Sequence, residues 1–96
     1  MTPKFHPGQV VATPGALDAL AESGQDAAFF LDKHLRGDWG EVDADDQKAN
    51  DTALLDGSRL LSSYRTLKGV ELWVLTEAVG DDGQRASTCI TTPSEY

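Results

Sequence analysis

Side chains alternate between hydrophobic and polar along the C-terminal third of the chain, which is the pattern of half-buried β-strands. Two glycine-containing turns divide this stretch, because glycine supplies the positive φ that hairpin loops need. The pattern predicts a three-stranded antiparallel sheet with strands at 60–65, 70–77 and 85–92. Residues 9–12 could add a short fourth strand.

The position of the first turn decides which side chains of the sheet face the core. A turn centred on Lys68 and Gly69 predicts a core face with Leu61, Leu72, Val74 and Ile90. The opposite face would then carry Tyr64, Trp73, Leu75 and Cys89, and end in a cross-strand pair of Glu77 and Arg85. So much aromatic surface is rarely left bare on a monomer. We therefore expect a homodimer or a protein partner to cover it.

Capping residues and apolar stripes predict three helices before the sheet. The first begins after Thr13, with Pro14 at its first position, and ends at Gly24. The second spans 26–36 and places His34 on its apolar stripe. The third runs from an N-cap at Asp43 to Asp56, and its thin apolar face requires polar partners for Asn50.

These elements predict a single α+β domain over residues 1–96. It consists of an extended arm at 1–8, a helical part at 13–57 and an antiparallel sheet at 58–92, with the helices packed on the sheet.

The chain is acidic, with 16 Asp and Glu against 8 Lys and Arg and a net charge of −8. Much of the excess lies in the segment 38–56. This charge argues against general binding to nucleic-acid phosphates. It fits a basic partner, a nucleic-acid mimic or a solvated, solubilising surface, and the last is the commonest use of such a segment.

The remaining composition limits location and chemistry. One cysteine, Cys89, cannot form an internal disulfide, and no apolar run is long enough for a membrane span. We therefore expect a soluble cytoplasmic protein. No zinc cluster, P-loop or dinucleotide glycine pattern is present, so neither a metal nor a cofactor is expected.

Several blocks together resemble one family. They are TPGALDALAESGQ, FLDKHLRGDWG, KANDTALLDGSRLLSSYRT, LWVLTEA and RASTCITTPSEY. The chain is similar to a family of small bacterial proteins that are often labelled plasmid-related. The resemblance implies an accessory protein carried on mobile elements, and it implies no particular activity. The longer loop at 78–84 and Cys89 depart from the family pattern.

His34 is the centre of the predicted site. As a core histidine it would be held by a hydrogen bond. As a site residue it would meet Trp39, in the Gly37–Gly40 turn, and reach the sheet near Ser62 or Arg59. The predicted binding residues are Asp38, Trp39, Ser62, Tyr64 and Trp73.

A second hypothesis is a metal-independent ribonuclease in the manner of barnase-like and RelE-like toxins. Such an enzyme needs a base, an acid and cationic groups for the developing phosphorane. The candidate catalytic residues are His34, Arg59, Glu77 and Arg85. The acidic charge opposes this hypothesis, and whether the protein is an enzyme stays open. An accessory or interaction protein is the primary prediction.

Overall fold

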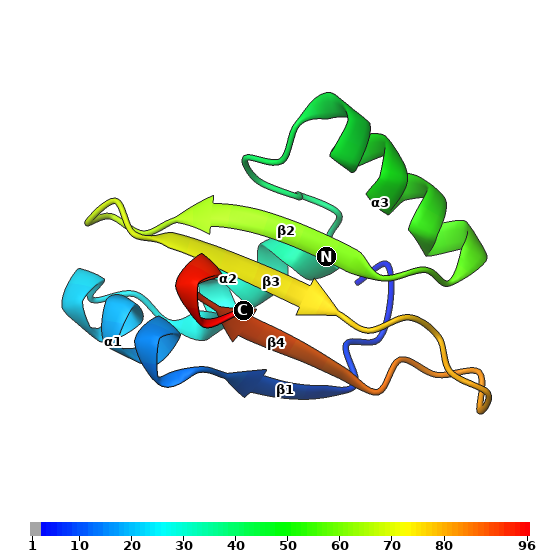
Figure 1. The fold of residues 1–96 in the computed structure, drawn as a ribbon, viewed down its shortest axis with the longest axis horizontal. Helices are drawn as coiled ribbons and strands as arrows, with labels where there is room; N and C mark the ends of the chain where they lie inside the picture. The colour runs from blue at the N-terminus through cyan, green and yellow to red at the C-terminus, as the bar shows by residue number, and fades with distance from the viewer. Residues whose placement is uncertain (1–2) are drawn as a thin grey trace.

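The computed structural model describes residues 3–96, which form an α+β fold (Figure 1). The strands are β1 (Gln9–Ala12), β2 (Leu60–Arg65), β3 (Glu71–Thr76) and β4 (Ser87–Thr91). The helices are α1 (Pro14–Ser23), α2 (Ala27–Leu35) and α3 (Ala44–Asp56), and a short 3-10 helix, η1 (Pro93–Glu95), follows β4.

The sheet is mixed and has four strands in the order β1-β4-β3-β2. Strands β2, β3 and β4 are antiparallel neighbours, whereas β1 pairs with β4 in parallel, with Gln9 opposite Ser87. The α+β class is confirmed, and the three-stranded antiparallel sheet is wrong. The error has a physical cause: the β1–β4 pairing joins two ends of the chain, and local periodicity does not encode such a pairing.

A three-residue loop in the first hairpin shifts β2 by one residue from its predicted register. The Thr66 N–H donates to the Val70 carbonyl at 2.9 Å, and Gly69 closes the loop with a φ of 83°. This is a common hairpin connection. A shift of one residue moves every side chain of a strand to the other face.

The shifted register corrects two predicted placements. Leu60, Ser62 and Tyr64 face the helices, so the placement of Leu61 in the core was wrong, as was the placement of Tyr64 on the outer face. The core placement of Leu72, Val74 and Ile90 is confirmed.

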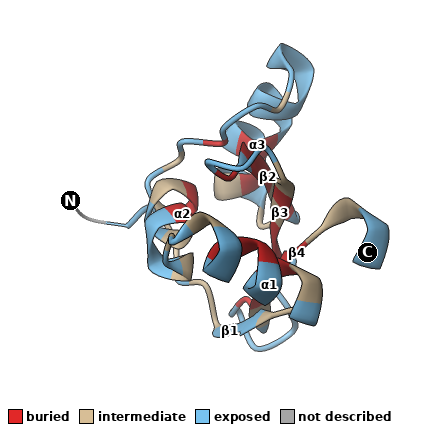
Figure 2. Cartoon of the chain, turned by 90° about the vertical axis from the view of Figure 1, so that its left-hand side faces the viewer, coloured by how far each residue is buried: buried red, intermediate tan, exposed pale blue. Residues whose placement is uncertain are grey.

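Helices α1 and α2 cover one face of the sheet, and the main core lies between them and the strands. Figure 2 shows the sheet between these helices and the C-terminal turn, with buried residues concentrated on the helix side. The predicted caps are present: the side chain of Thr13 accepts from the Ala16 N–H, and that of Asp43 accepts from the Asp46 N–H. The principal core side chains are Ala16, Leu20, Phe30, Tyr64, Leu72, Val74 and Ile90.

Helix α3 lies beside β2, at the edge of the sheet (Figure 1). The amide of Asn50 donates to the Leu61 carbonyl at 2.7 Å and accepts from the Leu61 N–H at 3.1 Å, so the predicted need for inward partners is confirmed. Gly40 forms a parallel bridge with Ser63. A Cβ at Gly40, whose φ is 75°, would collide with the Ser63 carbonyl, so the Gly-Asp-Trp-Gly turn requires glycine there.

The arm that precedes β1 returns over the end of α2. The Lys4 N–H donates to the Leu35 carbonyl at 2.8 Å, and Phe5 packs against a smaller cluster around Trp39, Ala53 and Leu60. Residues 1–2 of the predicted arm lie outside the described residues. None of the helices within 3–96 has the length and apolar character that a membrane crossing requires.

Candidate functional site

His34 lies in the last turn of α2 and is 0% exposed. The ring of Phe5 stands edge-on to it at 5.3 Å and that of Trp39 at 5.6 Å, measured between ring centroids. The predicted contacts of His34 with Trp39 and with Ser62 are therefore confirmed. The site is enclosed by the arm, the Gly-bracketed turn and the sheet, so it is a buried polar cluster and not an open pocket.

A continuous chain of hydrogen bonds runs through this cluster. Nδ1 of His34 is 2.5 Å from Ser62 Oγ, and Nε2 is 2.9 Å from Thr76 Oγ1. Thr76 Oγ1 lies 2.7 Å from Thr88 Oγ1, whose hydroxyl donates to the Pro7 carbonyl at 2.8 Å. The chain connects α2, three strands and the arm.

The Pro7 carbonyl fixes the direction of every proton in this chain, because a carbonyl can only accept. Thr88 donates its single hydroxyl proton to the Pro7 carbonyl, so its oxygen can only accept from the Thr76 hydroxyl. Thr76 therefore accepts from His34, which must carry its proton on Nε2, and Nδ1 accepts from Ser62. The hydrogen-bond network thus assigns the neutral Nε2–H tautomer to His34.

Burial keeps His34 uncharged. It lowers the pKa of His34 from 6.5 to about 4, and the positive charge of Arg85 adds to the effect. A proton on Nδ1 would also oppose the proton that Ser62 already points at that nitrogen. His34 is therefore neutral at pH 7.

The Ser62–His34–Thr76 arrangement has the outward form of a serine nucleophile with its general base. Two features argue against nucleophilic catalysis by Ser62. Ser62 and His34 are each 0% exposed, so a substrate cannot reach the hydroxyl. Every hydrogen-bonding position of His34 is also occupied by the fold. The cluster links the layers through satisfied polar contacts.

Arg85 is buried beside this cluster and holds three backbone carbonyls. Its guanidinium donates to Ser58 at 2.7 Å, to Glu77 at 2.9 Å and to Ala53 at 3.1 Å. The Ala53 carbonyl belongs to the last turn of α3, where a cation is favourable. The predicted pairing of the Glu77 and Arg85 side chains was wrong, because Arg85 reaches the Glu77 backbone and turns inward.

The four candidate catalytic residues do not meet at one place. His34 and Arg85 lie on the helix side of the sheet. Arg59 and Glu77 are exposed and line a groove on the outer face. The sheet separates the two pairs, so they do not surround a common phosphate position.

The other predicted binding residues are distributed over both faces. The Tyr64 hydroxyl donates to the Asp38 carbonyl at 2.5 Å, and the Asp38 side chain is exposed near Lys33. Burial raises the pKa of Tyr64. Trp73 lies on the outer face, where its Nε1–H donates to Glu71 at 2.9 Å.

The outer groove has a volume of about 230 Å³ and lies between the sheet and the C-terminal turn. Tyr96 forms one wall: its ring stands 5.5 Å from that of Trp73, and its hydroxyl accepts from Arg59 at 2.9 Å. The groove is lined by Thr13, Arg59, Leu75, Glu77, Cys89, Thr91, Glu95 and Tyr96. Partial burial, aided by the Glu95 carboxylate, raises the pKa of the Cys89 thiol, which makes Cys89 a poor nucleophile.

The C-terminal turn is held in place by Glu95, a residue whose role the sequence reasoning missed. Its carboxylate accepts from Thr13 Oγ1 at 2.6 Å, from Thr92 Oγ1 at 2.7 Å and from the Gly15 N–H at 2.9 Å. These donors lower the pKa of Glu95 to about 2. Thr-Pro-Ser-Glu is a capping box with proline at its first helical position, so this signal was readable.

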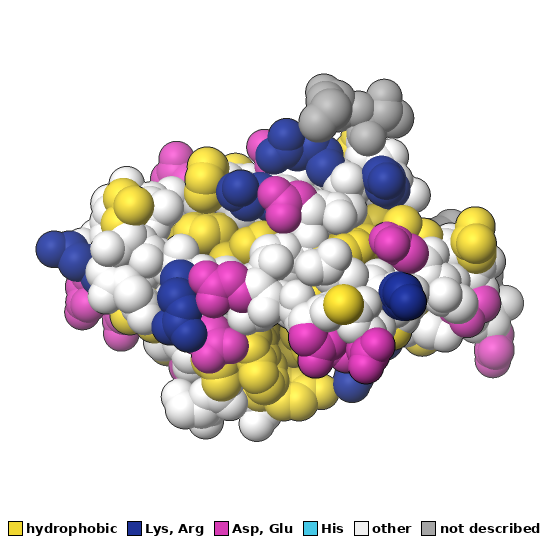
Figure 3. Space-filling model, turned by 90° about the horizontal axis from the view of Figure 1, so that it is seen from above, with side chains coloured by type: hydrophobic (Ala, Val, Ile, Leu, Met, Phe, Trp, Pro, Cys, Tyr) yellow, Lys and Arg dark blue, Asp and Glu magenta, His cyan; other side chains and the backbone are white. Residues whose placement is uncertain are grey.

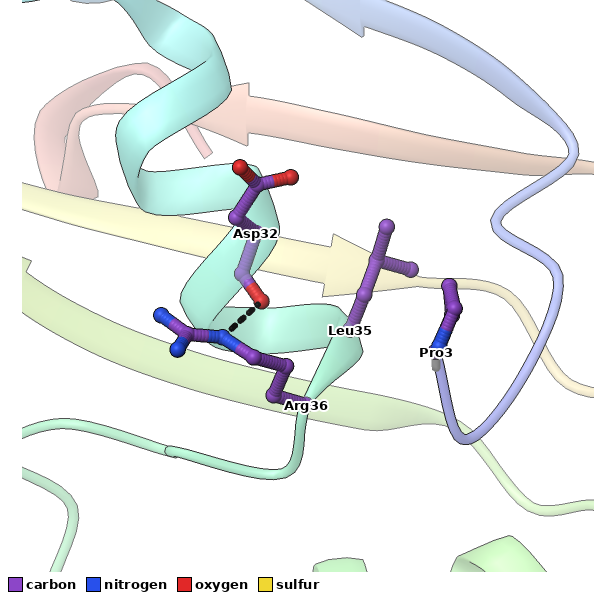
Figure 4. A pocket seen from close by; sticks show the side chains of 4 residues that line it. All are labelled: Pro3, Asp32, Leu35 and Arg36. Atoms are coloured by element: carbon purple, nitrogen blue, oxygen red, sulfur yellow. Dashed lines mark hydrogen bonds between the residues drawn. The ribbon is translucent and has the colours of Figure 1, made fainter. Parts of the chain in front are cut away.

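A further cavity of about 280 Å³ lies at the C-terminal end of α2 (Figure 4). Pro3, Asp32, Leu35 and Arg36 line it, and Arg36 Nε donates to the Asp32 carbonyl at 3.2 Å. Its polar groups do not converge on a common point, so it is a weaker candidate for a binding site. Within residues 3–96, no group of three or more His, Cys, Asp or Glu side chains is arranged to hold a metal ion.

Comparison with known proteins returned no significant match to a family model, to a curated protein or to a solved structure. The resemblance to plasmid-related bacterial proteins therefore stays a prediction.

Proposed function

We propose that this chain is a small accessory protein that works by binding a basic protein partner. The observation that carries the proposal is the enclosure of the His34–Ser62 pair, which leaves no route for a substrate to the best acid–base group. The outward-facing charge is acidic, with 16 acids against 8 bases. Such a field attracts basic partners and speeds their association.

The two other hypotheses have less support. A ribonuclease would need His34, Arg59, Glu77 and Arg85 around one phosphate, and these residues divide between the two sides of the sheet. A nucleic-acid mimic would use the acidic segment 38–56 as a phosphate-like array. Two of its carboxylates support the fold instead: Asp43 caps α3, and Asp51 accepts from Trp39 Nε1 at 3.1 Å.

The proposal includes a cytoplasmic location, which the unpaired Cys89 favours. It also keeps the link to mobile elements that the family resemblance implies. Neither is needed for the binding test.

Affinity selection of a random peptide library on the immobilised full chain tests the proposed function. The selection is run at about 0.15 M salt, where only charge pairs within about 8 Å are effective. We expect enriched peptides that combine Lys or Arg with apolar residues. In parallel, labelled RNA incubated with the protein should remain intact.

Two results would contradict the proposal. One is a selection that enriches no sequence above a control surface. The other is RNA cleavage that disappears in both Arg59→Gln and Glu77→Gln, which would favour the nuclease.

A further inference from the structure

The outer groove combines apolar surface with charged side chains. Tyr96 stays 64% exposed although its ring packs on that of Trp73, and Leu75 lines the groove with the 8% of its surface that is exposed. In Figure 3, hydrophobic side chains gather on the lower side of the view, the side of the outer sheet face, and acidic side chains border them. An exposed patch of this kind commonly marks a contact surface.

Carboxylates outnumber cations around this groove. Glu77 and Glu95 line the groove, whereas Arg59 is the single base in its lining within residues 3–96. Glu71 and Arg65 occupy paired positions further along the sheet, so neither sign is in excess there. Arg65 also pairs with Glu41 at 3.0 Å. The excess in the groove lining is therefore negative.

The carboxylates on the outer face differ in the hydrogen bonds that they already accept from the protein. Glu95 accepts from Thr13, Thr92 and Gly15, and Glu71 accepts from Trp73 and Ser63. Within residues 3–96, Glu77 is in no ion pair and it is exposed. Glu77 is thus the carboxylate that is free to meet an incoming charge.

Arg59 leaves Glu77 available because its guanidinium is engaged elsewhere. Arg59 directly precedes β2 and Glu77 directly follows β3, next to the paired positions Leu60 and Thr76, so the two residues lie side by side. Arg59 donates to the Tyr96 hydroxyl instead of pairing with Glu77. The groove therefore offers an apolar aromatic wall, an unpaired carboxylate and one competing cation.

From this geometry we propose that the outer groove binds a Lys or Arg side chain of the partner. The aliphatic stem lies along Leu75 and the ring of Tyr96, and the charged end meets Glu77. Long basic side chains suit such a site, because their stems bury against apolar surface while their charge stays at its edge, and a cation near a tyrosine ring gains further stabilisation. This inference rests on the proposed function and assigns its site.

The test uses a labelled probe peptide, acetyl-GSLKRLSG-amide, and its acidic counterpart, acetyl-GSLEELSG-amide. Fluorescence anisotropy measures binding of each to the full chain. We expect the basic peptide to bind and the acidic peptide to bind at least about tenfold more weakly. Glu77→Gln should weaken binding of the basic peptide about threefold to fivefold, the upper range of one exposed ion pair.

Two further variants sharpen the test. Asp45→Asn removes the same charge as Glu77→Gln, but from the exposed start of α3, and should change the dissociation constant less than about twofold. Arg59→Gln removes the competing cation and should strengthen binding of the basic peptide. All three positions are exposed, so unchanged melting temperatures would show that the fold is intact.

Each contrary outcome has one meaning. If Glu77→Gln and Asp45→Asn weaken binding equally, the groove is not the site, and the proposed binding of a basic partner still stands. If the basic peptide does not bind while the library selection yields other peptides, the groove assignment is likewise overturned. If neither probe peptide binds and the library yields nothing, the proposed function fails as well.

Discussion

The two faces of the sheet carry similar residue types and use them differently. On the helix side, one chain of hydrogen bonds joins Ser62, His34, Thr76 and Thr88, and within residues 3–96 no buried side-chain polar atom lacks a partner. On the outer side, Glu77 is exposed and forms no ion pair with any residue of the described range 3–96, although Arg59 lies beside it. Polar residues that satisfy one another support the fold, whereas polar residues left unsatisfied at a groove are available for a partner.

The largest expected effect is the loss of the fold when a charge enters the helix side. Val74→Asp places an unpaired carboxylate at a position that is 0% exposed, and we expect a cost of about 4 kcal/mol or more, enough to unfold the domain. Cys89→Ser, a small change on the outer face, should leave the fold intact. Circular dichroism and thermal melting compare the two, and an unchanged melting temperature for Val74→Asp would invert the face assignment.

The second prediction concerns acid and His34. The pKa of His34 is 6.5 when unfolded and about 4 when folded, so between these values the unfolded chain binds more protons and stability falls as pH falls. The loss relative to pH 7 should reach about 2 kcal/mol at pH 5 and about 3 kcal/mol at pH 4.

Urea denaturation at pH 7 and pH 5 measures this loss. His34→Gln should be less stable at pH 7 by roughly 2 kcal/mol, and it should lose most of the difference between the two pH values. A wild-type midpoint that does not move between pH 7 and pH 5 would refute the neutral, buried histidine.

The third and smallest prediction compares two arginines. Arg85→Met removes a donor from three carbonyls and should cost about 2 kcal/mol, because buried acceptors lose charge-assisted hydrogen bonds. Arg59→Met, on the exposed outer side, should cost less than about 0.5 kcal/mol. Urea midpoints measure both, and equal costs would mean that Arg85 does not stabilise the end of α3.

Local signals predicted the parts of the fold that depend on neighbouring residues. Thr13 and Asp43 cap their helices as expected, and Gly24 and Gly57 end α1 and α3 in the left-handed conformation. One error arose where distant segments meet, and the other arose in a local hairpin loop. The parallel pairing of β1 with β4 has no local pattern, and the extra residue in the 67–69 loop reversed the faces of β2 because strand periodicity is two.

The site was predictable to a similar degree. The spacing that put His34 on the inner stripe of α2 led correctly to Trp39 and Ser62. The roles of Thr76 and Thr88 could not be found in the same way, because threonines are ordinary on strands and their partners come from the sheet register. Arg85 was misread because a hairpin pair with Glu77 is the local expectation, whereas its actual partners lie on α3 and before β2.

The two edges of the sheet differ in their capacity for intermolecular growth. At β2 the Gly40 bridge and the Asn50 amide occupy the strand backbone, which blocks the addition of a strand from another molecule. β1 is the opposite edge strand: it pairs with β4 on one side only, and its residues Val10 and Val11 are exposed. Its ladder is only four residues long, and short edge strands are one way in which proteins resist aggregation. Because the β2 edge is blocked, any strand-to-strand aggregation of the folded protein should begin at β1. A Val11→Lys substitution in this strand should improve solubility at high concentration.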